Sequence, residues 1–168
     1  MKKVFALMML AISLLMSSAY AAEENTNKED KQMHQEFTTV FAIGAKNDAY
    51  AKYFVGQSYL NRLSIEQVGI ANVTFEPGCR NNWHIHHANK GGGQILLVTG
   101  GRGYYQEWGK EARELLPGDV VNIPAGVKHW HGAAPNSWFA RLAIEVPGEN
   151  TRNEWCEPVA EKEYKSLK

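Results

Sequence analysis

Residues 78–101, GCRNNWHIHHANKGGGQILLVTGG, and residues 118–131, GDVVNIPAGVKHWH, decide the fold of this chain. In the first stretch, five residues separate a glycine from a His-x-His triplet, and six residues separate a glutamine from a closing glycine. In the second stretch, a glycine is followed after five residues by Pro-Ala-Gly and, two residues later, by a histidine. This fixed glycine and proline spacing turns scattered histidines into a candidate site.

The two stretches contain four candidate metal ligands: His84, His86, Gln94 and His129. Alternate residues of a strand share one face and lie about 6.6 Å apart, so His84 and His86 point the same way. Gln94 joins them if its face of the following strand lines a barrel interior. Three imidazoles and an amide oxygen together predict a mononuclear metal centre with room for a substrate.

Short strands punctuated by glycine and proline continue along most of the chain. Such strands recur about every 8 to 12 residues, a pattern typical of an all-β sandwich or barrel. Only the tail, residues 161–168, has a helical pattern. The expected strands cover residues 50–60, 69–75, 94–99, 103–108, 110–116, 120–124, 128–132 and 138–146.

The N-terminal residues have the features of a secretory signal. Two lysines precede an apolar run and an Ala-Tyr-Ala pattern, so residues 1–21 are predicted to be a signal peptide, cleaved on export to a bacterial periplasm. The alternative is an uncleaved anchor, although the apolar run is short for a membrane span. Residues 22–36 are polar and aperiodic, which predicts a flexible leader ahead of a single domain at residues 37–168.

Charge and cysteine content narrow the classes of partner. Without residues 1–21, the 18 basic residues become 16 against 18 acidic ones, so nothing favours nucleic acid or a membrane surface as a partner. The two cysteines, Cys79 and Cys156, can form a disulfide in an oxidising compartment, but two separate thiols are the favoured interpretation. A thiolate ligand from Cys79 is a minor alternative.

The paired motifs resemble those of the cupin superfamily, in which the first motif carries a glutamate and the second commonly ends in an asparagine. This chain departs from that pattern at Gln94, at Ala133, and in a longer spacer at residues 88–93. The missing carboxylate argues against oxalate-type activity. The resemblance covers about residues 66–165. Over these residues the chain is similar to small bacterial cupins, a group that includes the manganese-dependent hydroxynitrile lyases.

The resemblance implies a jelly-roll barrel, commonly a homodimer. Its lyase members bind metal through two histidines, a glutamine and a histidine, which correspond to His84, His86, Gln94 and His129. Manganese is the expected divalent ion; iron, zinc and nickel are alternatives. Neutral ligands leave the ion its full charge, which suits Lewis-acid chemistry on a small oxygenated substrate.

Three further residues are candidate catalytic groups. His131 shares a strand face with His129 and is predicted to act as general base or acid; the alternative is a core histidine bonded to a backbone carbonyl. Arg141 and Glu145 share a face of the last long strand, and the resemblance places them in the pocket, where Arg141 orients an anionic substrate and Glu145 moves a proton. The alternative is a surface ion pair.

The function expected from these residues is that of an exported metal-dependent enzyme with lyase, decarboxylase, isomerase or oxygenase chemistry. The second hypothesis is non-catalytic, metal-dependent binding of a small carboxylate or sugar acid. A purely structural metal is disfavoured because the sequence supplies no closed set of thiolate ligands. The fold hosts many reactions, so substrate and reaction class remain open at this point.

Overall fold

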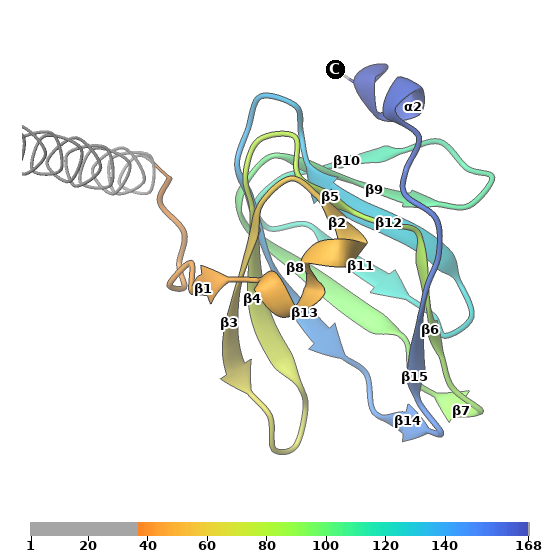
Figure 1. The fold of residues 1–168 in the computed structure, drawn as a ribbon. Coiled ribbons are helices and arrows are strands. Elements are labelled where there is room, and N and C mark those ends of the chain that lie inside the picture. Colours follow the sequence, from red (N-terminus) through yellow and green to blue (C-terminus); the bar gives the residue numbers. More distant parts are fainter. Residues whose placement is uncertain (1–36, 168) are drawn as a thin grey trace, which may run out of the picture. The chain divides into compact units, whose positions relative to one another are not determined.

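Two antiparallel sheets form the fold within the residues that the structure describes, 37–167 of a computed structural model (Figure 1). The predicted signal peptide and leader, residues 1–36, lie outside the described residues. The chain divides into two units, Met1–Thr38 and Thr39–Lys168, and every described strand and helix belongs to the second. No helix within residues 37–167 has both the length and the apolar character needed to cross a membrane.

The first sheet has six strands among the described residues, and β13 lies between β4 and β8. Its hairpin and crossover connections bring residues 70–75, 94–101 and 139–145 side by side, although they are far apart in sequence. In spatial order the strands are β1 (Ala45–Lys46), β3 (Ser58–Ser64), β4 (Ile70–Phe75), β13 (Phe139–Glu145), β8 (Gln94–Gly101) and β11 (Val120–Ile123).

The second sheet has seven strands among the described residues, with β12 at its centre. Strand β6 pairs with β12, and β15 continues the sheet beyond β6. A separate two-stranded pairing joins β7 (Lys90–Gly91) to β14 (Gly148–Glu149). The strands of the second sheet are β10 (Arg113–Leu115), β9 (Gly103–Glu107), β12 (Lys128–Ala133), β5 (Arg80–Asn81), β2 (Phe54–Val55), β6 (His84–His87) and β15 (Arg152–Trp155).

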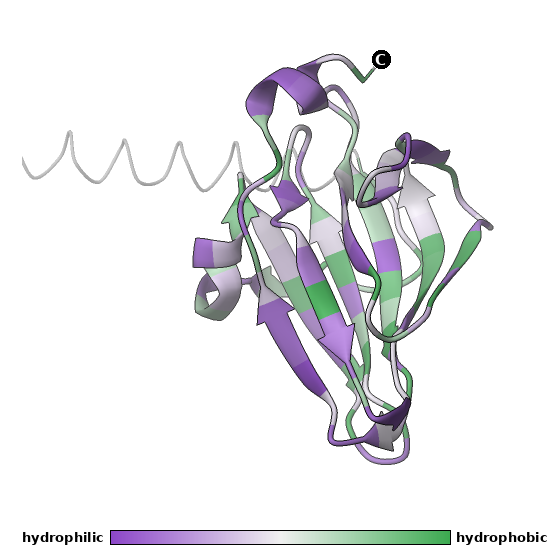
Figure 2. Cartoon of the chain, turned by 90° about the vertical axis from the view of Figure 1, so that its right-hand side faces the viewer, coloured by the Kyte–Doolittle hydropathy of each residue, from purple (hydrophilic) through white to green (hydrophobic). Residues whose placement is uncertain are grey.

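Alternation of buried and less buried residues along the strands shows which face of each sheet packs inward. Strand β8 buries every second residue, and the hydropathy colouring shows bands of both kinds along the strands (Figure 2). The main core contains side chains of both sheets, which therefore face each other. This core includes Val73, Phe75, Leu96, Val98, Tyr105, Leu115, Val121, Ile123 and Phe139.

A second apolar cluster covers the outer face of the second sheet beneath the C-terminal segment. Trp130 of β12 lies in this cluster with Tyr164 of the short helix α2 (Glu161–Lys165). Buried Arg80 packs over the Tyr164 ring, with its guanidinium carbon 4.0 Å from the ring centroid, and forms an ion pair with Glu161. These contacts attach the C-terminal segment to β5 and β12.

The expected all-β fold with a short helical tail is confirmed, with local corrections. Residues 50–53, expected to begin a strand over residues 50–60, instead belong to the 3₁₀ helix η1 (Asp48–Tyr53). Strand β15 was not predicted, because RNEW has no clear alternation. Cys79 and Cys156 are free thiols, as favoured. These corrections matter because η1 and β15 both border the cavity described next.

Candidate metal centre and cavity

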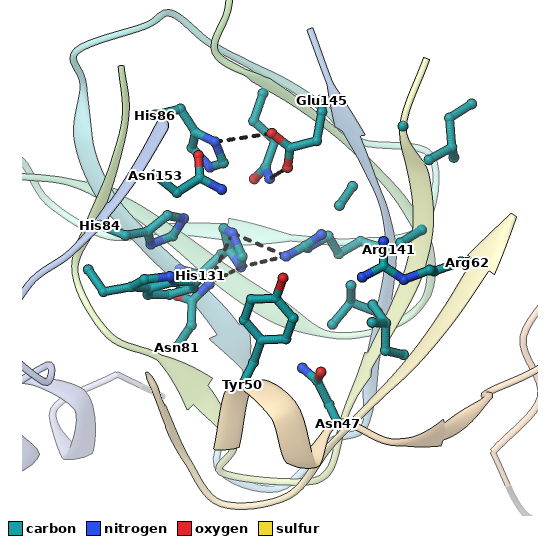
Figure 3. A pocket seen from close by; sticks show the side chains of 18 of the residues that line it. Asn47, Tyr50, Arg62, Asn81, His84, His86, His131, Arg141, Glu145 and Asn153 are labelled. Carbon is teal, nitrogen blue, oxygen red and sulfur yellow. Dashed lines mark hydrogen bonds and ion pairs between the residues drawn. The ribbon is translucent and has the colours of Figure 1, made fainter. Parts of the chain in front are cut away.

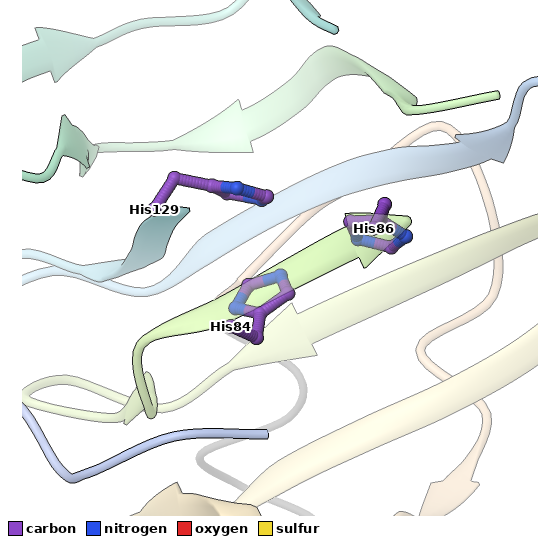
Figure 4. A group of neighbouring side chains, drawn as sticks. All are labelled: His84, His86 and His129. Atoms are coloured by element: carbon purple, nitrogen blue, oxygen red, sulfur yellow. The ribbon is translucent and has the colours of Figure 1, made fainter. Parts of the chain in front are cut away.

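Three of the predicted ligands converge between the two sheets. His84 and His86 lie on β6, and His129 lies opposite His84 in the β6–β12 pairing (Figure 4). One potential ligand atom from each histidine lies within 4.8 Å of the others. All three side chains are buried, so the predicted convergence of alternate histidines is what the structure shows. Within residues 37–167, the group contains no cysteine, and burial raises the pKa of the Cys79 thiol.

Hydrogen bonds from the backbone fix the orientation of two of these rings. Nδ1 of His84 lies 3.0 Å from the Asn82 carbonyl oxygen, and Nδ1 of His129 lies 2.9 Å from that of Val127. Because a carbonyl only accepts, each Nδ1 carries the proton and Nε2 keeps its lone pair. Nε2 of His129 is buried and has no hydrogen-bond partner among residues 37–167. Metal-binding histidines typically have this outer hydrogen bond and a free second nitrogen.

Gln94 begins β8 beside the histidines and is held by Glu145. Its Nε2 donates a hydrogen bond of 2.9 Å to Oε1 of Glu145, while its own Oε1 is buried without a partner. Gly93 sets the start of the strand with φ of 93°, where a Cβ atom would approach the Ile123 carbonyl oxygen to 2.2 Å. The amide oxygen thus remains available as a fourth ligand.

Glu145 also contacts the histidine group. Its Oε2 lies 3.2 Å from Nδ1 of His86, and it faces Gln94 across the β13–β8 pairing. Burial alone would raise the pKa of Glu145, but the contacts with His86 and Gln94 bring that pKa below its ordinary value. The carboxylate is therefore positioned to orient two candidate ligands, a role that sequence reasoning did not assign to it.

Burial keeps His84 and His129 in the form that binds metal. Desolvation, with neighbouring His129 and His86, lowers the pKa of His84 well below its ordinary value. Desolvation also lowers the pKa of His129 to about 4. Both imidazoles are therefore neutral at neutral pH, as ligation requires.

His84, His86 and Gln94 line a cavity of about 500 Å³ that opens between the sheets (Figure 3). A volume of this size holds a small organic molecule. The predicted residues His131, Arg141 and Glu145 border the same cavity, so the structure brings them together with the candidate ligands. Ala71 and Val73 also line it, and their small side chains leave room for a substrate.

His131 is buried on the cavity side of β12, while Trp130 points to the outer cluster, as strand parity predicts. Its ring nitrogens lie 3.0 and 3.2 Å from the side-chain nitrogen of Asn81 and 3.2 Å from Nη2 of Arg141. Desolvation and Arg141 lower the pKa of His131 well below its ordinary value. The ring is thus neutral, and its neighbours are side-chain donors rather than a backbone carbonyl, so its unprotonated nitrogen is the one that accepts from them.

Arg141 lies in the interior, which rules out the alternative of a surface ion pair. It is 3% exposed, and burial lowers its pKa to about 9, against an opposing contribution from Glu145. The β13–β8 register shifts between Ala140 and Arg141, so that Arg141 pairs with Val98 and Thr99 is passed over. Such an irregularity re-aims side chains next to it.

Sequence reasoning missed several residues of the cavity wall. Trp155 of β15 stacks on His84 with ring centroids 4.8 Å apart, and Tyr50 of η1 borders the opening. Asn81 and Arg62 also line the cavity. The aromatic content of residues 50–54 and 155 was a signal, but only the tertiary pairing of β15 with β6 places it here.

The stacked sheets and histidine-lined cavity define a jelly-roll protein with a candidate mononuclear metal site. A family model described as a cupin domain matches residues 71–142. The chain is 44% identical over 95 residues to an (R)-mandelonitrile lyase from Granulicella tundricola, covering 56% of this chain and 70% of that protein. The chain therefore belongs to the cupin superfamily.

Solved structures agree with this placement. A cupin-like protein from Thermotoga maritima matches with a TM-score of 0.66 and 38% identity, covering 77% of this chain and 96% of that one. A DMSP lyase from Ruegeria pomeroyi matches with a TM-score of 0.50 and 17% identity, over 74% of this chain and 64% of that one. The second similarity concerns the fold alone.

Proposed function

We propose that this chain is a metal-dependent enzyme that acts on a small oxygenated substrate by lyase-type chemistry. The observation that carries the proposal is a set of buried ligand atoms without hydrogen-bond partners among residues 37–167, Nε2 of His86 and Oε1 of Gln94, on the wall of a cavity large enough for a substrate. The similarity to an (R)-mandelonitrile lyase supports the lyase class.

The proposed ligands are His84, His86, Gln94 and His129. A divalent ion, manganese by our proposal, supplies Lewis acidity toward a substrate oxygen when bound. Iron, zinc and nickel are the alternatives that metal analysis must separate. The ligands themselves are neutral, so they do not reduce that acidity as a carboxylate would.

The other residues of the wall have proposed roles in binding and proton transfer. Arg141 orients the substrate from the opposite part of the cavity. His131 and Glu145 are the proposed proton-transfer groups, since both line the cavity. Glu145 has a second task, because it holds His86 and Gln94 in place.

The alternative is a binding protein that holds a small carboxylate or sugar acid without converting it. The hydrogen bonds between His131, Asn81 and Arg141 favour this alternative, because they occupy the ring that a general base needs free. A chain that binds such a ligand but forms no product from it is a binding protein rather than an enzyme.

The test begins with metal content and continues with turnover. The full chain, loaded with each metal in turn, should bind about one ion per chain and convert (R)-mandelonitrile or a member of a panel of hydroxy acids and ketones. His129→Ala should lose both metal and turnover, whereas His131→Ala should keep the metal and lose turnover. Turnover unchanged in His131→Ala would remove its proposed role, and a chain that binds no metal would refute the function.

We also propose export to the periplasm and assembly as a homodimer. Export rests on the signal-like residues 1–21. The homodimer rests on the resemblance to dimeric cupins. Fractionation of cells that express the full chain, and the mass of the purified protein in solution, test the two proposals separately.

A further inference from the structure

Arg141 carries a buried charge that forms no ion pair with a carboxylate among residues 37–167, although Glu145 acts on it at longer range. It is 3% exposed, and its hydrogen bonds within residues 37–167 go to the ring nitrogens of His131, a neutral group. Its Nε and Nη1 atoms are buried without a partner. An isolated buried cation costs considerable free energy, so this arrangement is unfavourable in the free protein.

Arg62 adds a second guanidinium to the same cavity. It lies on β3, pairs with Ala71 of β4, and Ala71 pairs in turn with Ala143 of β13, two residues beyond Arg141. The two small alanine side chains leave the space between the arginines open, and both arginine side chains border that space in Figure 3. No ion pair or hydrogen bond of Arg62 is found among residues 37–167.

The remaining charges of the cavity wall do not cancel these two. Glu145 is the acidic residue among the described lining residues, and it contacts His86 and Gln94. Arg152, the third arginine of the wall, has Glu154 as a partner at 3.9 Å. The end of the cavity formed by Arg62 and Arg141 is therefore positively charged. The guanidinium N–H groups there can donate paired hydrogen bonds to a planar anion such as a carboxylate.

We propose that the cavity binds small organic acids, with the carboxylate on Arg141 and Arg62 and a second oxygen of the same molecule on the metal site. This inference rests on the proposed function and names its substrate class: small carboxylic acids that carry a hydroxyl or keto oxygen. Tyr50, Phe54 and Trp155 also line the cavity and accommodate an apolar or planar remainder of the acid.

Matched pairs of ligands test the charge requirement directly. The probes are glycolate, lactate and mandelate, each compared with its neutral amide, which has nearly the same shape. Calorimetric titration of the metal-loaded full chain should show at least one acid binding about tenfold or more tightly than its amide, as expected for charge-assisted hydrogen bonds. If none of the three acids binds more tightly than its amide, the inference is overturned.

Variants separate the arginines from the metal as the source of that preference. Arg62→Gln and Arg141→Gln should each remove most of the preference, and Arg141→Lys should retain part of it. Arg113→Gln, which removes a charge on β10 outside the cavity, should leave it unchanged. If both Arg62→Gln and Arg141→Gln keep the preference for acids over amides, the arginine subsite is refuted. Because Arg62 is exposed, its variant gives a result even where Arg141→Gln does not fold.

The two proposals fail in different ways. Metal content of the same samples is measured first, and protein without metal refutes the metal-dependent function. Metal-loaded protein with equal affinity for acids and amides keeps that function and refutes the acid-binding inference.

Discussion

Arg80 and Arg141 are both 3% exposed, yet they lie in opposite environments. Arg80 faces the outer cluster, where Glu161 and the Tyr164 ring compensate its charge. Arg141 faces the cavity, where two of its nitrogens have no partner. Nε of Arg80 also has no hydrogen-bond partner among residues 37–167, so the difference lies in the carboxylate: Arg80 forms an ion pair with Glu161, and Arg141 forms none with the described residues.

This difference distinguishes a buried arginine that stabilises the fold from one that is available to bind a ligand. In the C-terminal region, Glu161 and the Tyr164 ring compensate the charge of Arg80, and these contacts attach α2 to β5. The cavity wall leaves His86, Gln94 and Arg141 with buried polar atoms that have no hydrogen-bond partner among residues 37–167. Buried polar atoms without partners are uncommon in folded proteins, so their clustering on one cavity indicates a site for ligands.

The largest expected effect is on the C-terminal side. Arg80→Met removes the cation over the Tyr164 ring and its hydrogen bond to the Gly78 carbonyl oxygen, so we expect a loss of about 2 kcal/mol in unfolding free energy. Denaturant titration of the metal-free protein measures it. Stability equal to that of the unchanged chain would contradict a compensated, stabilising Arg80.

Glu145→Gln tests the cavity side through metal affinity. Since Glu145 orients His86 and Gln94, we expect affinity for the divalent ion to fall by about tenfold, with one ion still bound per chain. Glu149→Gln, on β14 and exposed, is the control. Equal affinity in both variants would exclude the orienting role.

Arg141→Met is the direct counterpart of Arg80→Met. Replacing an uncompensated buried cation with an apolar side chain should raise the unfolding free energy by about 1 kcal/mol in the metal-free protein. The same denaturant titration compares the two variants. A loss as large as that of Arg80→Met would mean that Arg141 serves the fold rather than a ligand.

The smallest effect concerns His87, the outward neighbour of His86. Its Nε2 lies 2.7 Å from Glu154 in a half-exposed pair. His87→Ala should change stability by less than about 0.5 kcal/mol and leave metal affinity unchanged. A marked loss of bound metal in this variant would show that the two faces of β6 are not as distinct as we describe.

Strand parity made much of the site predictable from the sequence. Alternation on β6, β8, β12 and β13 correctly placed His84 with His86, Trp130 away from His131, and Arg141 with Glu145. Contacts made by long-range pairing were not predictable. Trp155 reaches His84 only because β15 pairs with β6, and the Arg80 contact depends on where α2 docks.

The roles of individual polar groups were also beyond the sequence. Glu145 was predicted as a proton shuttle, and the structure adds its hydrogen bond with Gln94. The motif marked His131 as a candidate base, but the Asn81 contact comes from the neighbouring β5. Such details depend on side-chain geometry that spacing does not encode.

The most direct test of a ligand-binding cavity side is anomalous diffraction from crystals of the manganese-loaded full chain. We predict one peak per chain, within coordination distance of nitrogens of His84, His86 and His129 and of the Gln94 amide oxygen. A loaded crystal with no peak among these residues, or with the peak on another part of the chain, would contradict the account.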